Sequence, residues 1–307
     1  MTMINVNNLT MEYKAGKGVF DIDFQMQKGD VYGFLGPNGA GKTTTIRCLL
    51  GFMKPSKGDC AISDKDCFTA ATRLSLDIGY IPGETSFPSG MTGKDFLNFV
   101  ASVRAEEAKR RGVKDERLTK AAQTVRMNAF IRLFELDIRP KIKTMSKGMK
   151  QKTAIIAAFM HDPDVFILDE PTSGLDPLMQ SRFVDLLMAR KREGKTILIS
   201  SHMFEEIEQT VDRIMIIRDG RIVENSDIKS LRAAQKKVYY ASGVGLGKKK
   251  FTADTKALSD DEIEATIPAD SVDAFVKELA KHKVDVLYQK NVSLERIFLD
   301  YYGEVQQ

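Results

Sequence analysis

Apolar and polar residues alternate near the start of the chain. Phe20, Ile22 and Phe24 are separated by single aspartates, and a spacing of two is typical of a strand with one buried face. A second segment, residues 5–11, precedes them across a polar turn that contains glycine. The pattern predicts two antiparallel strands, at residues 5–11 and 18–27.

Shorter apolar runs follow, and each fits a strand that is buried on both faces. They lie at residues 30–35, 78–81, 165–168, 196–199 and 213–217. Helical spacing predicts helices between several of these strands, at residues 44–50, 178–192 and 203–211. Because strands that alternate with helices favour a mainly parallel sheet covered on both sides, we expect an α/β fold.

Amphipathic helices are expected between the second and third of these buried strands. Apolar residues recur with helical spacing over residues 91–159, as on helices that cover a core. Lys, Arg and Glu dominate residues 105–118, a composition typical of a solvated helix face. We therefore expect a helical subdomain at about residues 88–160.

The last part of the chain contains no chemical motif. The expected larger domain ends with a hairpin turn at residues 219–220 and a short helix around residues 228–234. Residues 236–250 combine lysines with several glycines and suggest a boundary followed by a hairpin. The residues that follow are expected to form a small α/β appendage. The expected domains are residues 1–234 and residues 235–307.

Composition limits the classes of protein to which the chain can belong. Of its 307 residues, 43% are hydrophobic and 29% are charged, which permits a sizeable core. The longest apolar run, residues 154–160, is much shorter than the roughly 18–20 residues that cross a bilayer. The N-terminus has no signal-peptide pattern. We expect a cytosolic protein.

The net charge and the cysteines give no sign of nucleic-acid binding, disulfide bonds or a zinc site. The formal net charge of +4 is too small to indicate nucleic-acid binding by itself, and it suits either a soluble enzyme or work beside an anionic membrane. Cys48, Cys60 and Cys67 are odd in number and form no C-x-x-C pair. Neither a disulfide framework nor a zinc site is indicated.

The strongest chemical motif lies at residues 36–44. It fits the phosphate-loop pattern G-x-x-x-x-G-K-[ST] at Gly36, Gly41, Lys42 and Thr43, between a predicted strand and a predicted helix. Glycines let the backbone wrap around a phosphate, and the N–H groups of the loop and helix start point at the anion. Lys42 adds a positive charge, and Thr43 offers its hydroxyl to Mg²⁺. The alternative is a glycine-rich turn without a ligand.

Two carboxylates follow the strand at residues 165–168. Asp169 stands where an acid facing a phosphate loop holds Mg²⁺, usually through water. Glu170 is then placed to orient or deprotonate the attacking water. Taken alone, paired acids at a strand end are as often surface or capping residues, but together with the phosphate loop they indicate hydrolysis of a nucleoside triphosphate.

These motifs and those that follow them resemble the ATP-binding subunit of ATP-binding-cassette (ABC) transporters over residues 2 to about 234. Residues 173–176 match the family's D-loop, and His202 matches its switch histidine. Residues 145–149 stand where the family has its signature Leu-Ser-Gly-Gly-Gln, with Ser146 and Gly148 at its phosphate-facing positions. The resemblance implies the ABC form of the P-loop NTPase fold, with an antiparallel β subdomain and a helical subdomain.

The resemblance implies a set of site residues. Catalysis is assigned to Lys42, Glu170 and His202, and Mg²⁺ binding to Thr43, Asp169 and Glu84. The implied ATP contacts are Tyr13, Gly36, Asn38, Gly39, Ala40, Gly41, Lys42, Thr43, Thr44, Ser146, Gly148 and Asp176. Tyr13 stands where the family stacks an aromatic ring on adenine; it can equally be a core aromatic, and Phe20 is the competing aromatic.

The chain departs from the family pattern at two places. Lys147 and Met149 replace a glycine and the glutamine of the signature. Because Ser146 and Gly148 are kept, phosphate binding should survive. Lys147 either adds a positive charge at the dimer interface or points to water. After Pro82, where the family has a glutamine that touches Mg²⁺, the chain has Gly83 and Glu84. Either Glu84 replaces that ligand through a shifted loop, or the loop only transmits motion.

The resemblance also implies partners. The family binds ATP between the phosphate loop of one subunit and the signature of another, so we expect a second nucleotide-binding subunit, with a homodimer favoured, and a separate ABC-type membrane permease at the inner face of the cell membrane. Residues 87–97 and 292–300 resemble the branch that pairs with six-helix (ABC-2 type) export permeases. No nucleic-acid partner is expected. The alternatives are a soluble ABC ATPase acting on ribosomes or nucleic acid, and an interaction protein that binds nucleotide without turnover.

Overall fold

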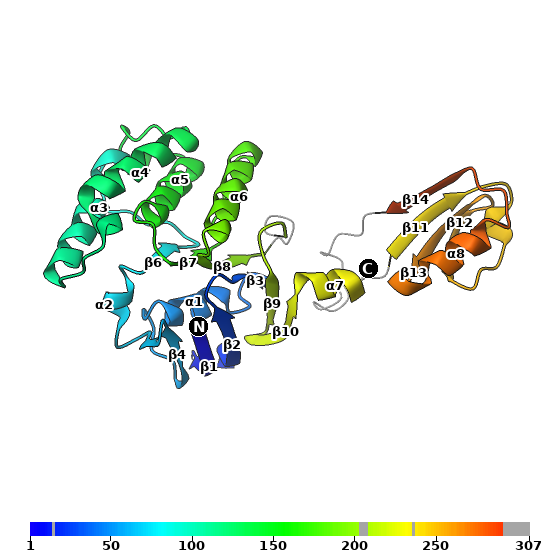
Figure 1. The fold of residues 1–307 in the computed structure, drawn as a ribbon, viewed down its shortest axis with the longest axis horizontal. Coiled ribbons are helices and arrows are strands. Elements are labelled where there is room, and N and C mark those ends of the chain that lie inside the picture. Colours follow the sequence, from blue (N-terminus) through cyan, green and yellow to red (C-terminus); the bar gives the residue numbers. More distant parts are fainter. Residues whose placement is uncertain (14–15, 203–207, 235–236, 291–307) are drawn as a thin grey trace. The chain divides into compact units, whose positions relative to one another are not determined.

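The computed structural model describes residues 1–13, 16–202, 208–234 and 237–290 (Figure 1). The chain forms two compact units, Met1–Asn225 and Ser226–Gln307, and each is described by itself. Part of the helix expected at residues 203–211 and the segment 292–300 lie outside the described residues. No described helix is both long enough and apolar enough to span a membrane.

A six-stranded sheet forms the centre of the first unit, as the alternation of strands and helices predicts. Neighbouring strands are parallel from β6 to β7, β8, β3 and β9. Every residue of β3, β7 and β8 is buried, which explains their continuous apolar sequences. In sheet order the strands are β10 (Arg221–Asp227), β9 (Arg213–Arg218), β3 (Val31–Leu35), β8 (Thr196–Ser201), β7 (Val165–Asp169) and β6 (Ile78–Ile81).

A separate antiparallel sheet contains the alternating segment found first in the sequence. Its order is β2 (Gly18–Gln27), β1 (Thr2–Glu12), β4 (Lys57–Ile62) and β5 (Lys65–Asp66). Ile22 and Phe24 are buried as expected, but Val19 takes the next buried place and Phe20 is only half-buried. Asp21 has a φ of 51°, and this left-handed residue interrupts the alternation.

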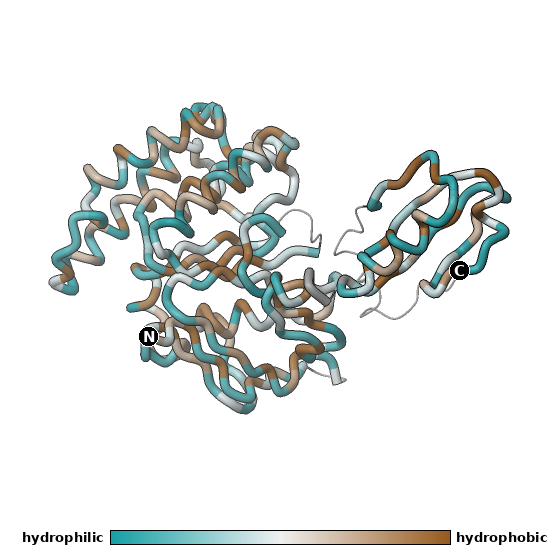
Figure 2. The backbone as a smooth tube through the Cα atoms, turned by 45° about the vertical axis from the view of Figure 1, so that its right-hand side comes forward, coloured by the Kyte–Doolittle hydropathy of each residue, from teal (hydrophilic) through white to brown (hydrophobic). Residues whose placement is uncertain are grey.

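Helices cover the sheet and build the expected helical part, where α3, α4 and α5 group together (Figure 1). Thr92 begins the first of them with a capping box, since its hydroxyl accepts from Asp95 N at 3.1 Å and its own N–H donates back to the Asp95 carboxylate at 3.2 Å. Polar and apolar residues alternate along these helices (Figure 2). The helices are α1 (Lys42–Leu49), α2 (Ala71–Leu74), α3 (Gly93–Arg110), α4 (Lys120–Leu133), α5 (Lys147–Phe159) and α6 (Pro177–Arg192), with short 3₁₀ turns at Glu116–Leu118 and Ile142–Thr144.

Aromatic packing fixes α5 and α6 against strand β7. Phe159 of α5 stacks on Phe166 of β7 with ring centroids 4.3 Å apart, and it meets Phe183 of α6 edge-on at 6.1 Å. All three rings are fully buried. Because such contacts tolerate little displacement, the end of α5 and the start of β7 hold fixed positions relative to each other.

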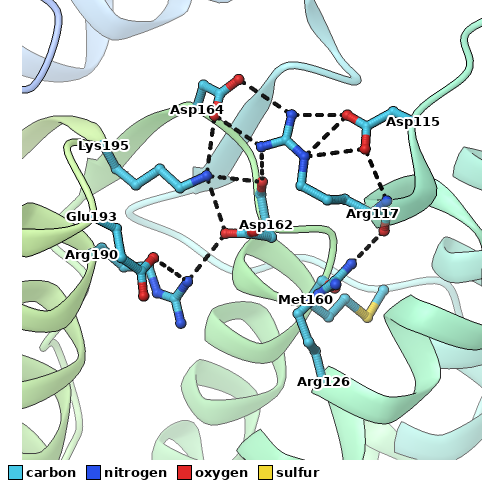
Figure 3. Close-up of polar contacts among 9 residues, drawn as sticks. All are labelled: Asp115, Arg117, Arg126, Met160, Asp162, Asp164, Arg190, Glu193 and Lys195. Carbon is cyan, nitrogen blue, oxygen red and sulfur yellow. Dashed lines mark hydrogen bonds and ion pairs between the residues drawn. The ribbon is translucent and has the colours of Figure 1, made fainter.

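Ion pairs also join the amino end of β7 to the helical part, in a group that we call the amino-end network (Figure 3). Arg117 donates to Asp164 at 2.9 Å and to Asp115 at 2.8 Å. Lys195 lies 3.2 Å from Asp162 and 3.1 Å from Asp164. The amino-end network comprises the charged residues Asp115, Arg117, Arg126, Asp162, Asp164, Arg190, Glu193 and Lys195. Hydrogen bonds from Arg117 hold the pKa of Asp115 and of Asp164 below the usual range.

In the described residues of the second unit, a four-stranded antiparallel sheet is present and the helix α8 (Val272–Leu279) packs against it. Residues 236–250 were expected to form a hairpin, and this prediction was wrong: β11 pairs with β13 and β14, which come much later in the chain. The hairpin lies instead between β12 and β13. The elements are α7 (Ile228–Ala234), β11 (Lys237–Ser242), β12 (Asp254–Ser259), β13 (Glu262–Ile267) and β14 (Val286–Lys290).

Candidate active site

The phosphate loop joins the end of β3 to the start of α1, and its glycines are required by close packing. A Cβ on Gly36 would lie 2.6 Å from the carbonyl oxygen of Ile217, and one on Gly41 would lie 2.4 Å from a methyl group of Val19. Gly41 also has a φ of 115°, which side chains rarely allow. The loop therefore packs closely against β9 and β2. The first N–H groups of α1, which have no partner within the helix, follow the loop directly.

Lys42 is a buried cation, with 5% of its surface exposed. Its ammonium donates to the carbonyl oxygens of Gly36 at 2.6 Å and Pro37 at 3.2 Å, and it lies 3.5 Å from a Glu170 oxygen. Burial lowers the pKa of Lys42, and the carboxylates of Glu170 and Asp169 act in the opposite direction. The loop therefore holds a positive charge that is poorly solvated and suited to an anionic ligand.

Asp169 joins three elements at the carboxyl end of β7. It is buried, and it accepts hydrogen bonds from Thr43 of α1 at 2.8 Å and from Ser200 of β8 at 2.5 Å. Parallel strands bring their carboxyl ends to the same edge of the sheet, which is where ligands bind in α/β folds. Carboxylate and hydroxyl oxygens are the ligands that Mg²⁺ prefers, so Thr43 and Asp169 fit the predicted metal role.

Glu170 follows in an unusual backbone conformation, with a φ of 46°. Its N–H donates to the backbone oxygen of Ser200 at 3.2 Å and to the hydroxyl of the same residue at 3.1 Å. Its carboxylate lies between Lys42 at 3.5 Å and His202 Nδ1 at 3.3 Å. A left-handed glutamate costs free energy and persists where the surroundings impose it, commonly at functional sites.

A cavity of about 280 Å³ lies over the phosphate loop. Tyr13 borders it, with its hydroxyl 3.3 Å from Thr44 Oγ1 and 3.4 Å from Met53 Sδ. The competing aromatic, Phe20, lies under the Arg221 guanidinium instead. The lining residues are Tyr13, Lys17, Gly18, Pro37, Asn38, Gly39, Gly41, Lys42, Thr43, Thr44 and Glu170. Gly36 and Ala40, also predicted as contacts, are buried residues of the loop and do not line the cavity.

Besides Gly36 and Ala40, three further predicted nucleotide contacts do not border this cavity. Ser146 caps α5, since its hydroxyl accepts from Met149 N at 3.2 Å. Gly148 lies in the first turn of the same helix. Asp176 caps α6 by accepting from Met179 N at 3.0 Å. One chain therefore brings together the phosphate-loop and strand-end residues but leaves these three apart from them.

The segment after β6 approaches Asp169 through a glycine. A Cβ on Gly83 would lie 3.2 Å from an Asp169 carboxylate oxygen. The neighbouring Glu84 is exposed, and it makes no hydrogen bond or ion pair with the described residues. Burial, with a contribution from the charge of Asp169, raises the pKa of the nearby Tyr80 to about 12. The role of Glu84 as a metal ligand stays a prediction.

Ser200 lies at the centre of this site and was not predicted from the sequence. Ser200 is fully buried and contacts both acids, by donating to Asp169 and accepting from Glu170 N. A signal was present, because Ser200 lies in the polar end of an otherwise apolar strand, two residues before His202. A hydroxyl at the buried end of a parallel strand is a candidate partner for a strand-end carboxylate.

The chain is similar to known proteins over most of its length. A sequence model of the family described as ABC transporter matches residues 19–173. An ABC transporter ATP-binding protein of Bacillus subtilis, YhcH, is 30% identical, with 100% of this chain and 98% of the relative covered. The SkfA peptide export ATP-binding protein SkfE of the same organism is 32% identical over 73% of this chain and 89% of its own.

The fold of the chain is also similar to solved structures of ATP-binding subunits. The structure of an ATP binding subunit of an ABC transporter superposes with a TM-score of 0.66 at 28% identity, covering 75% of this chain and 92% of its own. The resemblance inferred from the motifs is thereby confirmed, as are the predicted fold class and the assignment as an ATPase. The chain belongs to the ABC transporter family and is an ATP-binding subunit that hydrolyses ATP.

Proposed function

We propose that this chain hydrolyses ATP at a site completed by a second nucleotide-binding subunit, and that closure of the pair powers export through a separate membrane permease. The observation that carries the proposal is the division of the predicted contacts. Lys42, Thr43 and Glu170 border the cavity over the phosphate loop, whereas Ser146 and Gly148 do not. A helix start that is capped by Ser146 is suited to bind the phosphates held by another copy.

The residues of this chain have distinct roles in the proposed reaction. Lys42 and the N–H groups at the start of α1 bind the phosphates, and Tyr13 stacks on the adenine. Glu170 accepts the proton of the attacking water, and His202 orients the transferred phosphoryl group. The Lys42–Glu170 pair at 3.5 Å has a consequence here: phosphates that engage Lys42 compete with Glu170 and leave its carboxylate available as a base.

Mg²⁺ is the proposed cofactor, held by Thr43 and Asp169, with Glu84 as a further candidate ligand. When bound, it neutralises charge that develops on the phosphates. The hydroxyl of Thr43 donates to one carboxylate oxygen of Asp169, and the hydroxyl of Ser200 donates to the other at 2.5 Å, which fixes the carboxylate for this role.

We favour export as the direction of transport, because of the name of one relative and the sequence of one segment. One relative is named for peptide export, and residues 87–97 resemble the branch with six-helix export permeases. A chain that works on such a permease lies at the inner face of the membrane. The nature of the exported molecule depends on the permease, because the cavity over the phosphate loop is assigned to the nucleotide.

Affinity purification of the tagged full chain from detergent-solubilised membranes tests this proposal. We expect a membrane protein of about six spans to co-purify, and inside-out vesicles carrying both proteins to hydrolyse ATP faster than the chain alone. Vesicles made with the Glu170→Gln chain are the matched control. Co-purification with ribosomes or nucleic acid, and no membrane protein, would favour the soluble class of ABC ATPase instead.

A further inference from the structure

The first turn of α5 contacts the loop that follows Glu170, residues 171–175, which we call the post-Glu170 loop. Lys147 Nζ donates to the hydroxyl of Ser173 at 2.8 Å. One turn later, Gln151 Nε2 donates to the backbone oxygen of Pro171 at 2.7 Å. Residues four apart share one helix face, so a single face of α5 holds the post-Glu170 loop at two points.

Glycines make this contact close. A Cβ on Gly148 would lie 2.7 Å from the backbone oxygen of Gly174, and a Cβ on Gly174 would lie 2.9 Å from Cγ of Lys147. Gly174 also has a φ of 82°. The methylene chain of Lys147 thus lies along Gly174 before its ammonium reaches Ser173. A larger residue at position 174 would displace the lysine.

The post-Glu170 loop is in turn tied to the backbone of Glu170. Ser173 N donates to the Glu170 oxygen at 3.2 Å, and Leu175 N donates to the Thr172 oxygen at 3.0 Å. The N–H of Glu170 is held by Ser200. The left-handed conformation of Glu170 is therefore flanked by hydrogen bonds on both sides, and Ser173 belongs to one of them.

We propose that Lys147 is a positioning residue that couples the first turn of α5 to Glu170 within one chain. The coupling runs from the Lys147 ammonium to the Ser173 hydroxyl, and from Ser173 N to the Glu170 backbone. The glycine that stands at position 147 in the family signature has no side chain for this bond. The proposal rests on the proposed function in one respect, the role of Glu170 as the base.

A different role for Lys147 predicts different kinetics. If its charge acted directly on a nucleotide bound by another copy, its removal would weaken ATP binding and raise KM. If it acts through Ser173, the KM for ATP stays near the wild-type value and kcat falls, because only the base is displaced. The two roles are thereby separable.

A double-mutant cycle tests the coupling through ATP hydrolysis. We expect Lys147→Ala and Ser173→Ala each to lower kcat by about fivefold to tenfold, the effect of one solvent-exposed hydrogen bond. The double variant should be no worse than either single one, because both remove the same bond. Lys150→Ala, which removes the same charge from the next turn of α5, is the control and should leave kcat unchanged.

Hydrogen exchange tests the bond without any activity. In the nucleotide-free full chain, Lys147→Ala should speed exchange of the amides of residues 173–175, and Lys150→Ala should not. Unchanged exchange in Lys147→Ala, or additive losses of kcat with a raised KM, would overturn the coupling. If the wild-type chain showed no turnover, the proposed function would fail while the exchange result still decided the bond.

Discussion

Two buried lysines lie at opposite ends of the central sheet, and their surroundings differ in kind. Lys195 precedes β8, is 7% exposed, and has carboxylates at 3.1 and 3.2 Å. Lys42, at the other end, is 5% exposed, donates to two backbone oxygens, and has its nearest carboxylate, on Glu170, at 3.5 Å. One buried charge is neutralised by neighbours within the chain, and the other is only partly so.

The comparison shows how a cluster of charges that stabilises the fold differs from one prepared for a ligand. In the amino-end network, Arg117 and Lys195 each bridge two acids (Figure 3). At the carboxyl end of the same strands, burial lowers the pKa of Lys42 and Glu170 has a left-handed backbone. An incompletely paired charge beside a strained residue indicates that the missing partner comes from outside the chain.

The largest effect is expected from the lysine at the carboxyl end. Lys42→Ala should lower ATP turnover by about a hundredfold or more, because the bound phosphates lose their buried cation. The free energy of unfolding should not fall, since the variant also removes a poorly solvated charge. Steady-state ATPase assays and urea unfolding measure the two effects. Near-normal turnover would contradict the assignment of the phosphate loop.

The lysine at the amino end should behave in the opposite way. Lys195→Met keeps the apolar volume but leaves Asp162 and Asp164 with one partner fewer, and it should lower the free energy of unfolding by about 1–3 kcal/mol. Turnover per folded molecule should stay near the wild-type value. A large loss of turnover without a loss of stability would remove the distinction between the two ends.

Acid should weaken the amino-end network in a predictable range. Arg117 lowers the pKa of Asp115 and Asp164, so these carboxylates stabilise the fold above their ordinary pKa of about 3.9 and lose that contribution as the pH falls through their folded values. The stability gap between wild type and Arg117→Met should be constant near neutral pH and narrow below about pH 4. Urea unfolding from pH 3 to 7 measures it, and a gap independent of pH would exclude this origin.

The smallest effect concerns the loop after β6. If Glu84 contributes a ligand when ATP is bound, Glu84→Ala should raise the Mg²⁺ concentration for half-maximal turnover by about a few-fold. This is less than the roughly tenfold or more that a well-ordered partner of a metal ligand contributes, because Glu84 is exposed. Titration of ATPase activity with Mg²⁺ measures this, with Glu106→Ala, an acid within α3, as the control. An unchanged requirement would leave the loop with a mechanical role only.

Local patterns predicted the first unit well. The alternation through Ile22 and Phe24 and the apolar runs of β3, β7 and β8 carry the spacing that burial requires. The phosphate-loop motif likewise depends on residues that are adjacent in sequence. Where the determinant is local, the sequence was sufficient.

Contacts between distant segments were not predictable in this way. The bond from Lys147 to Ser173 and the contact of Ser200 with both acids join residues 26 to 31 positions apart. The pairing of β11 with β13 and β14 was mistaken for a local hairpin for the same reason. Strand partners and side-chain bonds of this kind depend on the assembled fold, which periodicity does not reveal.

The central claim, that ATP is enclosed between two copies, is tested most directly by the Glu170→Gln chain. Without the base, bound ATP should not be hydrolysed, and size exclusion with light scattering should show a dimer with ATP and a monomer without it. The double variant Lys42→Ala/Glu170→Gln, which cannot hold the phosphates, should remain monomeric. A Glu170→Gln chain that binds ATP yet stays monomeric at high protein concentration would contradict the claim.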